Sequence, residues 1–185
     1  MDEDARLMLR VREGDRAAFE TLFRRYTPRL LGFLSRMVPE RARAEELAQE
    51  VFVRVYQARD RYEPRSRFST WIFGIASNLA LNDLARAHRR REASWEEGAA
   101  DAKGSEPLAD ETLVARRTAE RIVRALQRLP DRQRAALMLR LEEGLGYTEI
   151  AETLGASLAS VKSLIHRARE NLLASLRDQN GGLDR

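Results

Sequence analysis

The sequence predicts an all-α fold, in which two small helical domains are joined by a flexible acidic linker. Apolar residues recur at helical intervals of three and four over most of the chain, and glycine and proline lie between these stretches. Residues 92–112 instead combine acidic residues with glycine, serine and proline, without periodicity. We therefore expect domains at 1–91 and 113–177 and a disordered tail at 178–185. The second domain is expected to hold four helices and to end in a helix-turn-helix.

The composition narrows the class of protein. Of the 185 residues, 43% are hydrophobic, which permits real cores, and 34% are charged. The net charge is only +4, so contacts to nucleic acid must come from local basic clusters. The absence of cysteine excludes disulfides, zinc fingers and thiol catalysis, and His88 and His166 alone do not suggest a metal site. We expect no metal and no cofactor.

The beginning of the chain resembles neither a signal peptide nor a membrane anchor. It is acidic first and has no apolar centre, and no run in the chain approaches the length of a membrane span. We therefore expect a cytoplasmic protein without membrane insertion.

The first two helical stretches are separated by a glycine. Residues 2–12 predict a short helix that ends at Gly14, and Asp15 is placed to cap the next helix. Proline fits a first helical turn and disrupts a helix interior, so Thr27 and Pro28 predict a kink or break. The buried face on both sides of this point is expected to contain Phe19, Leu22, Phe23, Tyr26, Leu30, Phe33, Leu34 and Met37.

Residues 44–59 predict a helix with an acidic outer face. The helical spacing of its apolar residues leaves Glu46, Gln49 and Glu50 together on the outside. Acidic residues early in a helix also favour its dipole, which is a sufficient explanation for Glu46. The alternative is a surface that docks a basic partner helix.

Residues 68–91 form the central predicted helix, preceded by a basic loop at 60–67. Ser69 or Thr70 is expected to cap the helix, and Ile72, Ile75, Ala76 and Leu79 form its buried face. Its polar face and basic end either suit the helix dipole or contact a polyanion. Aromatic residues near its start can stack on unpaired bases. The residues behind this second interpretation are Phe68, Trp71, Phe73, Asn78, Asn82, Arg86, Arg89 and Arg90.

The second half predicts four further helices. The first ends at Pro130, and the next spans about 131–143, with Leu137, Met138 and Leu141 inward and Gly144 as its stop. Thr148 is expected to cap a short helix, Gly155 to make a turn and Ser157 to cap the last helix.

These last two helices follow the pattern of a DNA-binding helix-turn-helix, whose second helix enters the major groove. The alternative is a helical hairpin with a solvated basic face. The candidate contacts to phosphates and base edges are Ser160, Lys162, Ser163, His166, Arg167 and Arg169.

Taken together, these motifs resemble the extracytoplasmic-function (ECF) sigma factors of bacterial RNA polymerase over about residues 15–177. The sequence AEELAQEVFVRVY is similar to the family's segment that binds core polymerase. The sequence FSTWIFGIASNLALNDLARAHRRR is similar to the segment that melts and reads the −10 promoter element. The sequence LPDRQRAALMLRLEEGLGYTEIAETLGASLASVKSLIHRARENL is similar to the domain that reads the −35 element.

The resemblance implies a role for each surface. Glu46, Gln49 and Glu50 would dock on the clamp helices of the largest subunit of core RNA polymerase, and the second domain would contact its flap. The −10 surface would comprise Arg67, Trp71, Asn78, Asp83, Arg86, Arg89 and Arg90. The −35 duplex would meet Ser160, Lys162, Ser163, His166 and Arg167. The partners implied are core RNA polymerase, promoter DNA and an anti-sigma factor.

For two residues the role implied by the resemblance has an alternative or cannot be filled by the residue present. Asp83 lies close to the buried stripe, so holding an arginine in place is an equal alternative to DNA contact. Leu164 stands where the family usually has an arginine, so one phosphate or intramolecular contact is expected to be missing.

Two other classes of protein are alternatives. A helix-turn-helix repressor or activator that acts without core polymerase would be a stable dimer on a palindromic site, and the sequence shows no dimer seam. A helical enzyme would need a nucleophile–base pair, a phosphate-binding glycine loop or a metal set, and none is found. We therefore expect no enzymatic activity.

Overall fold

The computed structural model describes residues 1–93 and 113–180, with side chains for 1–93 and 118–177. Over these ranges the chain is helical and contains no strand, as predicted. The first half comprises α1 (Glu3–Arg12), α2 (Arg16–Met37), α3 (Arg41–Gln57), the short 3₁₀ helix η1 (Arg59–Arg61) and α4 (Phe68–Ala93). The second half comprises α5 (Leu113–Gln127), α6 (Asp131–Leu141), α7 (Tyr147–Leu154) and α8 (Leu158–Asn180).

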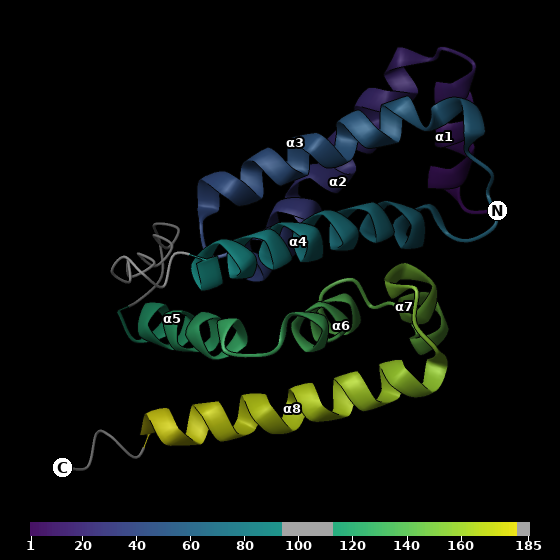
Figure 1. The fold of residues 1–185 in the computed structure, drawn as a ribbon. Coiled ribbons are helices and arrows are strands. Elements are labelled where there is room, and N and C mark those ends of the chain that lie inside the picture. Colours follow the sequence, from purple (N-terminus) through teal and green to yellow (C-terminus); the bar gives the residue numbers. More distant parts are fainter. Residues whose placement is uncertain (94–112, 181–185) are drawn as a thin grey trace.

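The two halves pack against each other along α4 (Figure 1). Helices α1 to α3 lie on one side of α4, while α6 and α7 lie on its other side and α8 lies farthest from it. Helix α2 also contacts α6. Buried apolar side chains from both halves form one continuous core, from Met8 on α1 to Val161 and Ile165 on α8. Burial of these side chains is the main force that holds the helices together.

The ends of the first helices are fixed by aspartates. Gly14 has a φ of +92°, a conformation that favours glycine, and Asp15 caps α2 by accepting a hydrogen bond of 3.0 Å from the Ala18 N–H. The predicted caps Ser69 and Thr70 are wrong, because both lie inside α4. The Phe68 N–H donates instead to the Asp2 carboxylate at 3.2 Å, from the start of the chain.

The expected break at Pro28 is absent, since α2 continues from Arg16 to Met37 with the proline inside it. Thr27 does not cap a new helix; its hydroxyl donates to the Phe23 carbonyl at 2.6 Å. Leu22, Tyr26, Leu30 and Phe33 are buried on both sides of the proline. This burial offsets the lost hydrogen bond, which is the usual way in which tertiary packing overrides a local helix breaker.

The helix-turn-helix is formed by α7 and α8. Gly155 has a φ of +55° in the turn, and the Ser157 hydroxyl accepts from the Ser160 N–H at 3.2 Å, so both predictions are confirmed. Thr148 does not cap α7, because α7 already begins at Tyr147 and Glu149 accepts from the Gly146 N–H at 2.7 Å. Leu141, which we expected to point inward, is 59% exposed at the end of α6.

Most of the predicted acidic linker lies outside the described residues, as does the tail beyond residue 180. Helix α4 includes residues 92 and 93, and α8 extends three residues past the predicted boundary at 177. Among the helices that the structure describes, none has the length and apolar character required to span a membrane.

Candidate nucleic-acid interface

The predicted docking residues lie together on the outer face of α3. Glu46, Gln49 and Glu50 are one helical turn apart, and the Glu46 and Glu50 side chains are 63% and 41% exposed. Glu46 accepts from Arg43 at 2.7 Å and Glu50 accepts from Arg54 at 2.6 Å. These exposed pairs within one helix are weak, so the carboxylates remain available to a basic partner.

An apolar patch continues this acidic face and was missed by the sequence interpretation. Val53 and Tyr56 are 53% and 49% exposed, and Phe23, which we assigned to the buried face of α2, is 41% exposed. Phe23 packs on Phe52, with ring centroids 4.5 Å apart. The signal was present in the spacing, because Val53 follows Glu46 and Glu50 by seven and three residues. The outer face of α3 is therefore amphipathic.

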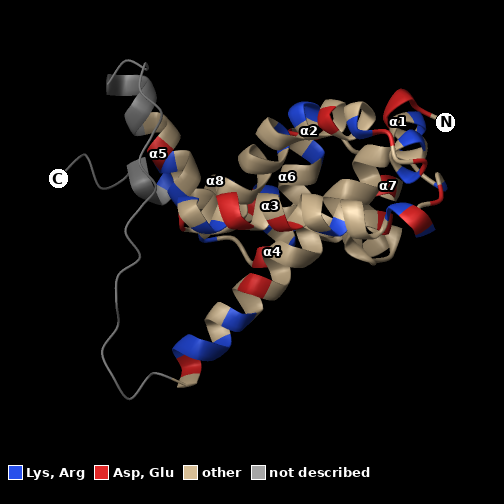
Figure 2. Cartoon of the chain, turned by 90° about the horizontal axis from the view of Figure 1, so that it is seen from above, with Lys and Arg blue, Asp and Glu red and all other residues tan. Residues whose placement is uncertain are grey.

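The basic end of α4 projects from the body of the protein (Figure 2). Asn78, Arg86, Arg89 and Arg90 are all exposed, as the polar face of the predicted helix requires. Within the described part of the chain, Arg86, Arg89 and Arg90 form no ion pair. This end of the helix therefore offers cations to an external polyanion.

Asp83 differs from these residues in being partly buried and paired. Its side chain is 16% exposed and accepts hydrogen bonds from Arg43 of α3, at 3.0 Å from Nε and 2.7 Å from Nη2. These bonds, followed by the bond to Glu46, raise the pKa of Arg43. The contact matches the alternative role predicted for Asp83, in which it holds an arginine in place.

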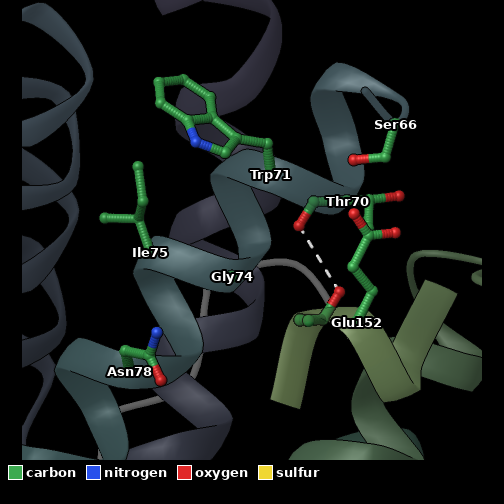
Figure 3. A pocket seen from close by; sticks show the side chains of 8 residues that line it. Ser66, Thr70, Trp71, Gly74, Ile75, Asn78 and Glu152 are labelled. Atoms are coloured by element: carbon green, nitrogen blue, oxygen red, sulfur yellow. Dashed lines mark hydrogen bonds between the residues drawn. The ribbon is translucent and has the colours of Figure 1, made fainter. Parts of the chain in front are cut away.

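A cleft of about 240 Å³ lies between the N-terminal half of α4 and helix α7 (Figure 3). Trp71 and Asn78, two predicted −10 residues, line it on the α4 side, and Glu152 and Thr153 line it on the α7 side. Trp71 packs on Tyr62 with ring centroids 4.8 Å apart, and burial raises the pKa of Tyr62 to about 12. The contribution of the second half to this cleft was not predicted from the sequence.

Polar contacts join the two walls of the cleft. The Thr153 hydroxyl donates to the Thr70 carbonyl at 3.4 Å, and the Thr70 hydroxyl donates to Glu149 Oε1 at the same distance. Arg67 Nε lies 3.7 Å from Glu149 Oε1. Arg67 and Thr70, two residues of the predicted −10 region, thus face carboxylates or backbone of α7.

Two ion pairs join α2 to the segment that follows α6. Arg29 Nε donates to Glu143 at 3.0 Å, and Arg36 Nε lies 2.7 Å from Glu142. The Glu143 side chain is only 3% exposed. Burial raises the pKa of both glutamates, against the opposing effect of the arginines.

The predicted −35 residues all lie on the exposed face of α8. Ser160, Lys162, Ser163, His166 and Arg167 are exposed, while Val161, Ile165 and Ala168 pack into the core. Leu164 is partly buried against the same core, so this position has a packing role here. His166 lies 3.5 Å from Glu170. In the part of the chain described here, no cluster of three or more acidic or histidine side chains could hold a metal ion.

A helix-turn-helix with an exposed recognition helix, joined to a second helical unit with a basic end, is typical of a DNA-binding protein. The family model for sigma-70 region 2 matches residues 22–91, and the model for sigma-70 region 4 matches residues 119–172. The chain is 37% identical to the RNA polymerase sigma-H factor of Pseudomonas aeruginosa, over 91% of each chain. It is 39% identical to the sigma factor CarQ of Myxococcus xanthus, over 89% of this chain and 92% of CarQ. It is 34% identical to the ECF sigma-E factor of Escherichia coli K12, over 90% of this chain and 91% of that factor.

The chain therefore belongs to the ECF group of RNA polymerase sigma factors. Solved structures agree with this assignment. The structure of CnrH, in complex with the cytosolic domain of CnrY, covers 96% of this chain at 25% identity, with a TM-score of 0.73. RpoE of Bartonella quintana, in complex with the anti-sigma factor NepR, shares the fold over 90% of the chain with a TM-score of 0.72.

Proposed function

We propose that this sigma factor binds core polymerase and two promoter elements through three separate surfaces on three different helices. The outer face of α3 binds core polymerase, the 60–67 loop and α4 bind the melted −10 element, and α8 binds the −35 duplex. The observation that carries this proposal is the separation of the candidate residues on exposed faces that point in different directions. Each of these helices is fixed from behind by buried side chains, so each surface is rigid.

The proposed polymerase-binding face combines charge with apolar surface. Glu46, Gln49 and Glu50 would pair with basic side chains of a clamp helix, and Val53 and Tyr56 would pack on its apolar side chains. Arg43 and Arg54 already pair with the two glutamates, so docking exchanges one set of weak ion pairs for another. Burial of the apolar patch would then supply much of the affinity.

The proposed −10 surface binds a single strand by stacking and by charge. Opening the duplex costs a few kcal/mol for each base that leaves the stack. Trp71 would stack on an exposed base, Asn78 would bond to its edge, and Arg67, Arg86, Arg89 and Arg90 would bind phosphates. Asp83 acts in this proposal through Arg43, as a positioning residue that fixes α4 on α3.

The proposed −35 surface is the exposed face of α8. Ser160, Lys162, Ser163, His166 and Arg167 would reach base edges and phosphates in the major groove. The chemistry is binding throughout, so we propose that the protein catalyses no reaction of its own. It would act in the cytoplasm, where polymerase and promoter DNA are found.

An anti-sigma factor is a further proposed partner. The structural relatives CnrH and RpoE were solved with the cytosolic domain of CnrY and with the anti-sigma factor NepR. A protein of that kind would control this chain by covering its polymerase-binding face or by holding the two halves together.

Run-off transcription with purified core polymerase and a genomic fragment library tests the proposal. We expect specific transcripts only when this chain is present. Glu50→Lys should abolish core binding in a pull-down and abolish transcription, while the helical circular dichroism signal is kept. Glu45→Lys is the matched control, because Glu45 is a similarly exposed neighbour on α3. Transcription that survives Glu50→Lys would contradict the docking role.

A further inference from the structure

The first residues of the chain lie beside the loop that leads into α4 (Figure 1). The Asp2 carboxylate accepts two hydrogen bonds there, at Oδ1 from the Ala5 N–H of α1 at 2.6 Å and at Oδ2 from the Phe68 N–H of α4 at 3.2 Å. Ala5 lies three residues from Asp2 in the sequence, and Phe68 lies 66 residues from it. One side chain therefore caps the starts of two different helices.

A carboxylate is suited to this position. The first N–H groups of a helix have no acceptor within the helix and carry a positive partial charge, so a negatively charged acceptor stabilises them. Because a carboxylate has two acceptor oxygens, Asp2 can bond to both helices at once. An asparagine has one acceptor oxygen and a donor nitrogen, so it could keep only one of the two bonds. We expect it to keep the bond to Ala5, which is the shorter and more local one.

A second aspartate of α1 supports the same region. Asp4 Oδ2 accepts from the Tyr26 hydroxyl at 2.7 Å, and the Tyr26 ring packs edge-on against Phe68, with centroids 5.1 Å apart. Tyr26 and Phe68 are both buried. Burial, followed by the charges of Asp2 and Asp4, raises the pKa of Tyr62, so this ring also lies near the acidic start of α1.

These aromatic rings support Trp71 in turn. The Trp71 ring centroid lies 5.6 Å from that of Phe68 and 4.8 Å from that of Tyr62. The Trp71 N–H donates to the Arg67 carbonyl at 3.2 Å, which closes the first turn of α4. Arg67 and Trp71 are two of the residues proposed to bind the −10 strand. Continuous contacts therefore run from Asp2 to that surface.

We propose that Asp2 is a positioning residue for the −10 surface, which fixes the first turn of α4 through the Phe68 N–H. The proposal rests on the proposed function for the role of α4 in binding the −10 strand. The match to sigma-70 region 2 begins at residue 22, so α1 precedes the segment that the family model matches. Side chains that are already ordered lose less freedom on binding, so a fixed first turn favours binding of the strand.

Amide hydrogen exchange in the free full-length chain tests the positioning role without DNA or polymerase. In Asp2→Asn we expect exchange at the Phe68 amide to become about fivefold faster, which is a typical effect of losing a helix cap, while the Ala5 amide is unchanged. Asp15→Asn is the matched control, because Asp15 caps α2 through Ala18 and its carboxylate otherwise bonds to Arg10. It should leave exchange at Phe68 unchanged. An unchanged Phe68 rate in Asp2→Asn would overturn the proposal.

Promoter opening tests whether this position matters for the −10 strand. The assay combines purified core polymerase with a promoter identified by run-off transcription, and permanganate reactivity of unpaired thymines reports the opened fraction. We expect Asp2→Asn and Asp2→Ala to lower this fraction about fivefold, in proportion to the ordered population of the first turn of α4. Pull-down of core polymerase should be unchanged, because the outer face of α3 is not altered. Asp15→Asn should open the promoter as the unmodified chain does.

The outcomes separate this proposal from the proposed function. Faster exchange at Phe68 with unchanged opening would overturn the link between Asp2 and the −10 surface, and so would an equal loss of opening in Asp15→Asn. Failure of the unmodified chain to open any promoter would instead contradict the proposed function, and the −10 role of Asp2 with it. The exchange rates, which need neither polymerase nor DNA, would still show whether Asp2 fixes the start of α4.

Discussion

Substitution of Asp83 can distinguish a structural role, in which it stabilises the α3–α4 contact, from a role in contacting DNA. Its carboxylate accepts two hydrogen bonds from Arg43 and is 16% exposed, while the Arg43 side chain is 34% exposed. A hydrogen bond to a charged group contributes about 1.5–3 kcal/mol. Because water reaches Arg43 and Glu46 shares it, we reduce this to about 1–2 kcal/mol for the loss of Asp83. For a chain of this length, Asp83→Ala should then lower the melting temperature by about 3–6 °C.

The assay is thermal unfolding followed by circular dichroism, carried out as a double-mutant cycle with Arg43→Ala. If the pair stabilises the α3–α4 contact, the double variant should be less destabilised than the sum of the single variants, with a coupling of about 1 kcal/mol. Glu45→Ala is the matched control. It breaks an exposed pair with Arg41 on α3 and should cost only about 0.3–0.5 kcal/mol. Loss of promoter opening in Asp83→Ala without any change in stability would refute the structural role and favour direct DNA contact.

Three further predictions concern the core, the crossing of α4 and α7, and pH. Phe73→Ala removes a fully buried ring that packs edge-on against Phe33, with centroids 5.5 Å apart, and should cost about 3–5 kcal/mol in urea unfolding. Gly74→Ala should raise stability by about 0.5–1 kcal/mol, because alanine favours a helix interior and its Cβ fits at 3.8 Å from Thr153; a lower melting temperature would show that the space is absent. Burial raises the pKa of Glu142 and Glu143 against the opposing effect of Arg36 and Arg29, so folding favours their protonated forms. Their contribution to the free energy of unfolding should therefore be largest near or below the ordinary glutamate pKa of 4.5 and be lost as the pH rises through the raised values. Urea unfolding followed over this pH range should show this loss in the unmodified chain and a smaller loss in a Glu142→Gln, Glu143→Gln variant.

The sequence predicted the elements of each half because their signals are local. Helical spacing identified the buried face of α4, and Asp15 and Ser157 identified two helix starts, since a cap acts over three residues. The same local rule failed at Ser69 and Thr70, because the group that bonds to the Phe68 N–H comes from Asp2, 66 residues away. Pro28 led to a wrong prediction for a related reason. The helical hydrogen bond that proline removes is a local effect, whereas the burial of Tyr26 and Leu30, which compensates for that loss, comes from tertiary packing.

In the candidate site too, local features could be predicted from the sequence and tertiary contacts could not. Exposure of Asn78, Arg86 and Arg89 follows from the period of one helix and was predictable. The contact of Glu152 with the cleft was not, because periodicity shows which face of a helix is buried and not which helix covers it. The apolar patch at Val53 and Tyr56 is an intermediate case. Its spacing from Glu50 was visible, but exposed apolar side chains cannot be told from buried ones by residue type alone.

The contact between the two halves combines close helix packing with long polar contacts. The crossing of α4 and α7 at Gly74 packs well, but the groups beside it are hydroxyls and carboxylates, and both hydrogen bonds across it are long, at 3.4 Å. Burial raises the pKa of Glu142 and Glu143, so desolvation offsets part of the attraction between these glutamates and their arginines. An interface of this kind specifies one geometry without holding it strongly, since mispaired charges would cost more than correct pairs contribute.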